Sequence, residues 1–192
     1  MCFTCLLQYP KKLIRFSDAF GQRNNDFNQF VHFYEHDSKY ERLWNNPKVY
    51  LEKLKKYDGV ITPDYSLYRE MPLCMQQWNT YRSRSLGFWL SKNGVPIIPN
   101  VRWGDERTYD FCFDGVEKNS TVAIGTHGCI KKVEDKYYFK LGFKEMLNRL
   151  TPKTVLVFGK TPDDIFEEFY NSNFEIIQYE SEFSLSREQV TA

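Results

Sequence analysis

The stretch STVAIGTHGC, residues 120–129, joins a short apolar run to a polar cluster. Three other stretches do the same: GVITPDYS (59–66), VPIIPNVRWGD (95–105) and TVLVFGKTPDD (154–164). A helix-like pattern follows each of them, and strands that alternate with helices predict a parallel β/α sheet. Because the carboxyl ends of parallel strands share one edge, where ligands usually bind, we expect the four polar clusters to converge in space.

The remaining sequence predicts further strands and helices around these four. Strands are expected over 11–16, 31–37 and 174–181, and helices from Pro47, over 72–92, over 140–150 and from Pro162. Residues 104–119 predict a connection with a short helix or an edge hairpin, and residues 130–139 a β-hairpin that turns at Glu134 and Asp135. The predicted fold class is α/β: a mainly parallel sheet of six or seven strands with helices on both faces, as an open sheet or an incomplete (β/α) barrel.

Length and composition indicate one globular unit. The chain has 192 residues, of which 42% are apolar and 27% charged. We expect a single α/β domain over 1–192, with flexible ends at 1–10 and 183–192. The formal net charge of +1 gives no bulk electrostatic attraction to nucleic acid or to an acidic membrane.

The five cysteines predict a reducing compartment. They are odd in number and irregularly spaced, which argues against a disulfide framework and for a cytoplasmic protein. The apolar stretch at the N-terminus is only a few residues long, too short for a signal peptide or a membrane span. Cys2 and Cys5 have the spacing of half a zinc site, but no matching pair follows, so we predict no metal site.

The strand ends carry a set of polar and aromatic side chains that form the candidate site: Asp64, Ser66, Asn100, Arg102, Trp103, His127 and Lys160. Asp64 and His127 are the catalytic candidates, since a carboxylate beside an imidazole can move protons near neutral pH. Arg102 and Lys160 can hold a phosphate or carboxylate, and Trp103 can stack on a base or sugar. The alternative is that these residues only cap loops and helices.

Two further binding candidates, Asn79 and Arg82, lie on the predicted helix over 72–92 and can line the same cleft. The alternative is that the arginines of this helix pair with local acids such as Glu70. Cys129 follows His127 by two residues, which allows a nucleophile with its base, although a core or loop cysteine is the competing interpretation. The P-loop, GxGxxG, HExxH and GxSxG motifs and paired CxxC motifs are missing, so no cofactor is indicated.

Several segments together resemble a known family. In chain order they are VHFYEHDSKYERLWNNPKVYLEKL, GVITPDYSLYREMP, QWNTYRSRSLGFWL, NGVPIIPNVRW, STVAIGTHG and LVFGK. Over most of residues 30–160 the chain is similar to the bacterial and phage family of unknown function DUF4417. The matching positions are Asp64, Ser66, Asn79, Arg82, Pro99, Trp103, Gly125 and Gly159. The resemblance implies a protein of a bacterium, phage or mobile element, and it carries no established activity.

Two hypotheses of different classes follow. The first is an enzyme or ligand-binding domain that acts on a nucleotide, a nucleic-acid end or a phosphorylated small molecule at the strand ends. The second is a non-catalytic protein of a phage or mobile element, a replication or anti-defence factor that binds DNA or a host protein. Both hypotheses place the protein in the cytoplasm of a bacterial or phage-infected cell, without a membrane partner.

Overall fold

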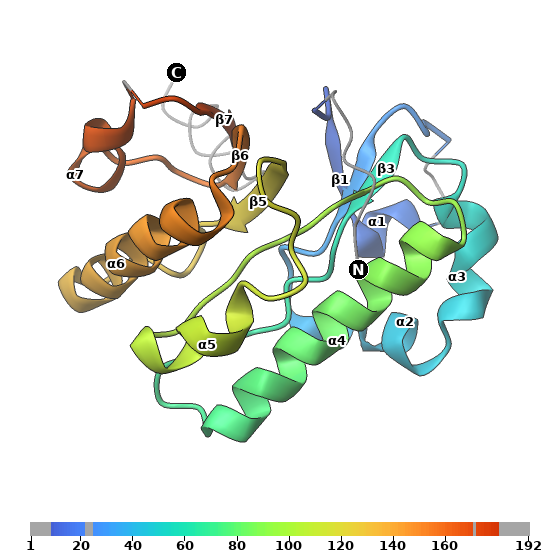
Figure 1. Ribbon diagram of the computed structural model, residues 1–192. Helices are drawn as coiled ribbons and strands as arrows, with labels where there is room; N and C mark the ends of the chain where they lie inside the picture. The colour runs from blue at the N-terminus through green and yellow to red at the C-terminus, as the bar shows by residue number, and fades with distance from the viewer. Residues whose placement is uncertain (1–8, 22–24, 171, 181–192) are drawn as a thin grey trace, which may run out of the picture.

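The computed structural model describes residues 9–21, 25–170 and 172–180 (Figure 1). Cys2 and Cys5 lie outside the described residues, as does most of the two ends that we expected to be flexible. The seven strands are β1 (Leu13–Arg15), β2 (Phe30–His32), β3 (Gly59–Ile61), β4 (Ile97–Ile98), β5 (Thr121–Gly125), β6 (Thr154–Phe158) and β7 (Glu175–Tyr179). All of their pairings are parallel, which confirms the predicted α/β class.

The strands form two sheets whose order follows the sequence. One sheet has the order β1-β2-β3-β4 and the other β5-β6-β7, so each has fewer strands than the single sheet that we predicted. A parallel bridge between Asn100 and Ala123 joins the two sheets. The Val101 N–H donates to the Ala123 carbonyl at 2.8 Å, and the Ala123 N–H donates to the Pro99 carbonyl at 2.9 Å. The strands therefore follow one another around a continuous parallel array.

One face of this array is filled by side chains of the strands themselves. Every strand supplies a residue to a single apolar cluster on this face: Leu13, Phe30, Ile61, Ile98, Ala123, Leu156 and Ile177. Among the described residues, no helix contributes to this cluster. Leu13 of β1 and Ile177 of β7 pack against the same cluster, and the Tyr179 hydroxyl of β7 donates to the Pro10 carbonyl just before β1. The array therefore curls, as in the incomplete barrel that is one of the two predicted architectures.

The helices pack on the outer face. They are α1 (Phe16–Ala19), α2 (Glu41–Asn45), α3 (Pro47–Leu54), α4 (Leu73–Lys92), α5 (Tyr109–Cys112), α6 (Val133–Leu150) and α7 (Asp163–Phe166), with 3₁₀ turns at Asp37–Lys39, Glu106–Thr108 and Glu167–Phe169. Residues of α1 to α4 share one core cluster with β2, β3 and β4. Residues of α5, α6 and α7 share another with β5 and β6. Figure 1 shows α6 beside the β5–β7 sheet and α3 beside the other sheet.

The predicted β-hairpin over 130–139 is wrong, because these residues enter α6. The Asp135 carboxylate accepts the backbone N–H of Lys132 at 3.2 Å and so caps the first turn of the helix. The buried positions Phe139, Phe143, Met146 and Leu150 then recur at helical spacing and face the core. The predicted helix over 72–92 and the short helix within 104–119 are confirmed as α4 and α5.

The described helices include none that is both long enough and apolar enough to cross a lipid bilayer.

Candidate ligand site at the strand ends

Asp64, Asn100 and Arg102 meet directly at the carboxyl ends of β3 and β4. The Asn100 side-chain amide donates to one Asp64 carboxylate oxygen at 2.8 Å. The Arg102 guanidinium donates to the other at 2.7 Å. The Tyr34 hydroxyl extends the chain of hydrogen bonds by donating to the Asn100 side-chain oxygen at 2.9 Å. Three segments far apart in sequence thus form one polar network, as the parallel topology predicts.

Hydrogen bonds to the backbone fix this network in place. The Asn100 N–H donates to the Thr62 hydroxyl at 2.8 Å, and the Tyr40 hydroxyl donates to the Asp64 carbonyl at 2.8 Å. Arg84 on α4 donates to the carbonyls of Asn100 and Cys112, which ties the end of β4 to α5. The network is therefore preorganised before any ligand binds.

Burial determines the charges in the network. Burial, together with the nearby Asp64 carboxylate, raises the pKa of Tyr34, so its hydroxyl stays protonated and acts as a donor. Burial by itself would lower the pKa of Arg102, but the Asp64 carboxylate outweighs it and keeps the guanidinium charged. The Asp64 and Arg102 side chains are 10% and 19% exposed, so this ion pair is only weakly screened by solvent.

Arg102 also reaches the half-buried thiol of Cys129, to which it donates at 3.3 Å. Burial raises the pKa of the Cys129 thiol, and the Arg102 charge only partly opposes this effect. Cys129 is therefore a neutral thiol at neutral pH, which makes it a poor nucleophile in this state.

A cleft of about 410 Å³ opens over Arg102 and Cys129. Its walls are the loop that follows β3, the segment after β4 and the start of α6, and its lining includes Tyr68, Arg69, Arg102, Gly128, Cys129, Lys132, Asp135 and Tyr138. This volume lies within the range of sites for nucleotide-sized ligands. The lining holds three cations, Arg69, Arg102 and Lys132, and three carboxylates, Glu70, Glu134 and Asp135. Arg69 pairs with Glu134 and Asp135, so Arg102 and Lys132 are the cations of the lining that no carboxylate of the lining pairs with.

Arg69 spans the cleft and couples two of its walls. Its guanidinium donates to Glu134 at 2.7 Å and to Asp135 at 3.3 Å, both on the first turn of α6. The same guanidinium lies 4.4 Å from the ring centroid of Tyr138. The Lys132 side chain is exposed at the rim, and none of the ion pairs among the described residues includes it.

Three of the predicted site residues hold the loop after β3 in place. Ser66 donates its hydroxyl and its N–H to Asp37 at 3.0 and 3.2 Å. Asn79 donates to the Ser66 carbonyl and accepts from Arg82. Arg82 also pairs with Glu41 at 2.8 Å, and its guanidinium lies 3.8 Å from the ring centroid of Tyr65. None of these three residues lines the cleft described above.

The three remaining predicted residues, Trp103, His127 and Lys160, differ in their burial and in whether they line the cleft. Trp103 lines the cleft but is 8% exposed, and its indole packs against Gly142 of α6 in the core. His127 and Lys160 are exposed on the loops after β5 and β6 and are not part of the cleft lining. Within the loop after β5, Gly128 and Cys129 line the cleft instead.

Sequence reasoning missed three residues of the site: Tyr34, Arg69 and Lys132. Tyr34 follows β2, one of the strands of the parallel array, so it could have been assigned to the same edge of the sheet. Arg69 and Lys132 lie in the two segments that flank the strand-end clusters, and their cationic side chains were the available signal. Among the described residues, no cluster of His, Cys, Asp and Glu has the arrangement of a metal site.

Comparisons with known proteins identify the family. The model of the family described as Domain of unknown function (DUF4417) matches residues 4–180, nearly the whole chain. The chain belongs to this family. No solved structure matches it.

Two relatives of this chain come from mycobacteriophages, and both carry the name "Gene 1 protein". The protein of Mycobacterium phage L5 is 37% identical over 130 residues, which are 68% of this chain and 57% of the relative. The protein of Mycobacterium phage D29 is 35% identical over 130 residues, 68% of this chain and 48% of the relative. The match therefore spans about half the length of these two relatives.

Proposed function

We propose that this DUF4417 protein binds a phosphorylated ligand, such as a nucleotide or a nucleic-acid end, in the cleft over Arg102. One observation carries the proposal. The Arg102 guanidinium is held by a hydrogen bond to the buried Asp64 carboxylate, and it lies in the lining of a cleft that also contains Arg69 and Lys132. A preorganised arginine binds phosphate with little loss of side-chain entropy. Tyr68 and Tyr138 offer aromatic surface for a base in the same cleft.

The proposal gives the predicted site residues different tasks. Asp64 positions Arg102, since its two carboxylate oxygens accept hydrogen bonds from Asn100 and Arg102. His127 lies next to Gly128 of the cleft lining but outside the lining itself, so acid–base catalysis by His127 requires its exposed side chain to turn toward the bound ligand. A hydrolytic activity would appear as phosphate release that His127→Gln abolishes while ligand affinity is kept.

Binding of inorganic pyrophosphate and of ATP, measured by isothermal titration calorimetry, tests the proposal. Arg102→Met removes the buried guanidinium and should weaken binding about 10- to 100-fold, because a charge-assisted hydrogen bond contributes about 1.5–3 kcal/mol. Lys132→Met should weaken binding several-fold. This second change is at an exposed position, so it keeps the test valid if Arg102→Met impairs folding.

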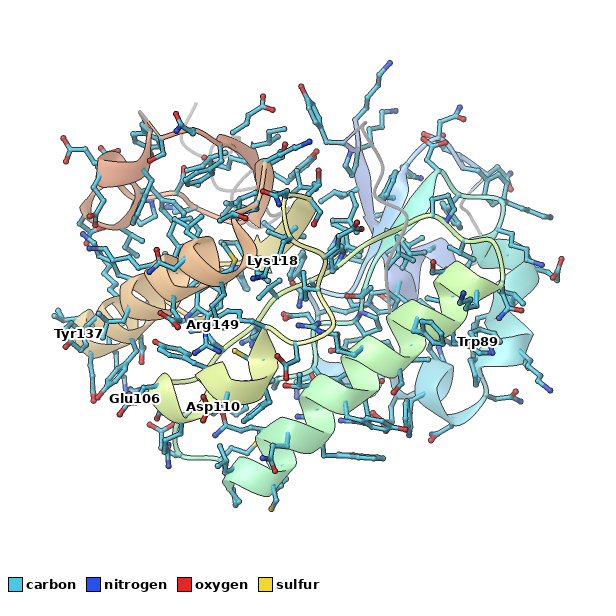
Figure 2. All side chains as sticks on the ribbon, viewed as in Figure 1. Trp89, Glu106, Asp110, Lys118, Tyr137 and Arg149 are labelled. Atoms are coloured by element: carbon cyan, nitrogen blue, oxygen red, sulfur yellow. The ribbon has the colours of Figure 1, made fainter. Side chains whose placement is uncertain are left out.

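The matched control is Arg149→Met, near the other end of α6 and labelled in Figure 2. This arginine pairs with Glu145 and with the Tyr109 carbonyl, and it does not line the cleft. The control should bind pyrophosphate as the wild type does. Equal affinity in the wild type and in the Arg102 and Lys132 variants would reject the site, as would absence of binding to the wild type.

A second candidate function is supported by the mycobacteriophage relatives. In this case the protein is a phage or mobile-element factor that binds a host protein or DNA in the bacterial cytoplasm. A DNA-binding factor should lose affinity for duplex DNA steeply as salt rises. A protein-binding factor should retain one host protein in a pull-down even when Arg102 and Lys132 are replaced, which the first proposal does not predict.

A further inference from the structure

The two arginines of the cleft pair with carboxylates that differ greatly in exposure. Arg102 pairs with Asp64 at 2.7 Å, and the Asp64 side chain is 10% exposed. Arg69 pairs with Glu134 at the same distance, but the Glu134 side chain is 65% exposed. Solvent and salt weaken an exposed ion pair much more than a buried one. Arg102 is therefore fixed to its partner, whereas Arg69 can exchange one partner for another.

The other contacts of Arg69 allow this exchange. Asp135 accepts from the guanidinium at 3.3 Å, while its second carboxylate oxygen accepts the Lys132 N–H and caps α6. Glu70 lies 3.8 Å away, beyond hydrogen-bond distance. The Tyr138 ring centroid lies 4.4 Å from the guanidinium, a stacking contact that leaves the N–H edges available to an anion. The exchange therefore concerns Glu134.

Glu134 offers Arg69 a weaker partner than a phosphate group does. The hydrogen bond from Arg69 lowers the pKa of the Glu134 carboxyl, so a carboxylate with a single negative charge holds the guanidinium at neutral pH. A phosphate group brings up to two negative charges and three acceptor oxygens, and it too binds arginine by paired hydrogen bonds. Glu134 lies on the first turn of α6, the end of the helix at which Tyr137 is labelled in Figure 2.

We propose that Arg69 is a second phosphate-binding arginine of the cleft and that Glu134 is its resting partner, which the phosphate of the ligand replaces. This inference rests on the proposed function, because it concerns the same ligand in the same cleft. Glu134 then acts as a built-in competitor that lowers the affinity of the free protein for anions. An anion that binds arginine less well than a carboxylate does, such as chloride, leaves the pair of Arg69 and Glu134 in place.

Calorimetric titration with inorganic pyrophosphate in about 0.15 M salt tests the competition. Glu134→Gln should strengthen binding about 3- to 5-fold, because the competing charge is removed from Arg69. Glu70→Gln is the matched control, since it removes the same charge from the same lining at a residue that makes no hydrogen bond with Arg69. It should strengthen binding less than about twofold, because salt screens an exposed charge.

The Arg69→Met variant shows whether the gain comes through Arg69. In this background Glu134→Gln should strengthen binding no more than Glu70→Gln does, because no arginine is left for Glu134 to occupy. Both glutamates are exposed, at 65% and 80% of their side chains, so their replacement leaves the core unchanged. Circular dichroism confirms that each variant is folded.

The side-chain Nε–Hε resonance of Arg69 reports the exchange directly, and Arg69→Met identifies it. Saturating pyrophosphate should shift this resonance, whereas sodium chloride at the same ionic strength should not. A wild type that binds pyrophosphate without this shift overturns the inference alone, and so does a Glu134→Gln variant that gains no more than Glu70→Gln. A wild type that binds no pyrophosphate overturns the proposed function and this inference with it.

Discussion

His32 shows how burial of one residue sets the response of the whole protein to acid. The side chain is 3% exposed, and its Nδ1 atom accepts the Tyr34 N–H at 3.2 Å. Burial, assisted by the positive charge of Arg15, lowers the pKa of His32 from 6.5 to about 3. An imidazolium could not accept the hydrogen bond from Tyr34, so the folded protein holds His32 neutral.

This pKa predicts that acid destabilises the fold. Between pH 6.5 and about 3 the unfolded chain binds the proton and the folded chain does not, so the free energy of unfolding falls as the pH falls. From pH 7 to pH 5 His32 should account for a loss of about 2 kcal/mol. Urea denaturation at both pH values should show that His32→Asn, which keeps an acceptor, removes this part of the loss. An identical loss in both proteins would show that His32 is not held neutral.

Individual residues were partly predictable from the sequence. Asp64, Asn100 and Arg102 were found because each follows a recognisable apolar strand, and parallel topology then brings them together. Arg82 could not be placed, because its partner Glu41 lies on a helix that no local pattern relates to α4. The polar residues of α4 predicted a face that lines a cleft, whereas they are buried beneath the helix.

At the scale of the element, α6 shows a limit of local pattern analysis. Residues 130–139 were predicted as a β-hairpin that turns at Glu134 and Asp135, but residues from Val133 onward form a helix on which Tyr137 is exposed and Phe139 is buried. The deciding features are the cap by Asp135 and the packing of Phe139 and Phe143 on the core. Asp135 can be recognised as a capping residue only if the helix is known to begin near Val133, and the sequence pattern did not place a helix start there.

Gly142 couples α6 to the strand-end segment and gives a prediction about this element. A Cβ atom there would overlap the Trp103 indole, which is 8% exposed and surrounded by core side chains. Gly142→Ala should therefore lower the free energy of unfolding by about 1–3 kcal/mol, although alanine favours a helix over glycine by about 1 kcal/mol.

Chemical denaturation of Gly142→Ala and of Leu141→Ala checks this coupling. Leu141 is 40% exposed at the neighbouring position, so its truncation should cost less than about 1 kcal/mol. A stabilised Gly142→Ala variant would mean that Trp103 can move away. In that case Trp103 would be free to rearrange at the cleft as well.

At the scale of the whole molecule, the parallel direction of the strands was the property that the sequence predicted best. Apolar runs separated by helices indicate a parallel array, and the pairings from β1 to β7 follow the sequence. The curl of the array was not predictable, since it depends on the apolar cluster that Leu13, Phe30, Leu156 and Ile177 build from both sheets. Long-range contacts of this kind leave no periodic signal in a single sequence.

The curl also explains why one site forms at the strand ends. Tyr34 from the β2 end, Asp64 from the β3 end and Asn100 from the β4 end face the same interior, and Gly125 on β5 leaves room for them. A Cβ atom on Gly125 would lie 2.9 Å from the Tyr34 ring. The polar network thus needs residues from several strands of the curled array. Arg102 belongs both to this network and to the lining of the cleft, so it links the network to solvent.

Amide chemical-shift mapping with inorganic pyrophosphate is the most direct test of the anion site. We expect a saturable set of shifts centred on Gly104, Gly128, Cys129 and Lys132, the segments that line the cleft. The same shifts should need about 10- to 100-fold more pyrophosphate in Arg102→Met, as a charge-assisted hydrogen bond is lost, and should be unchanged in Arg149→Met. Shifts confined to other surfaces, or a spectrum that pyrophosphate leaves unchanged, would contradict the account.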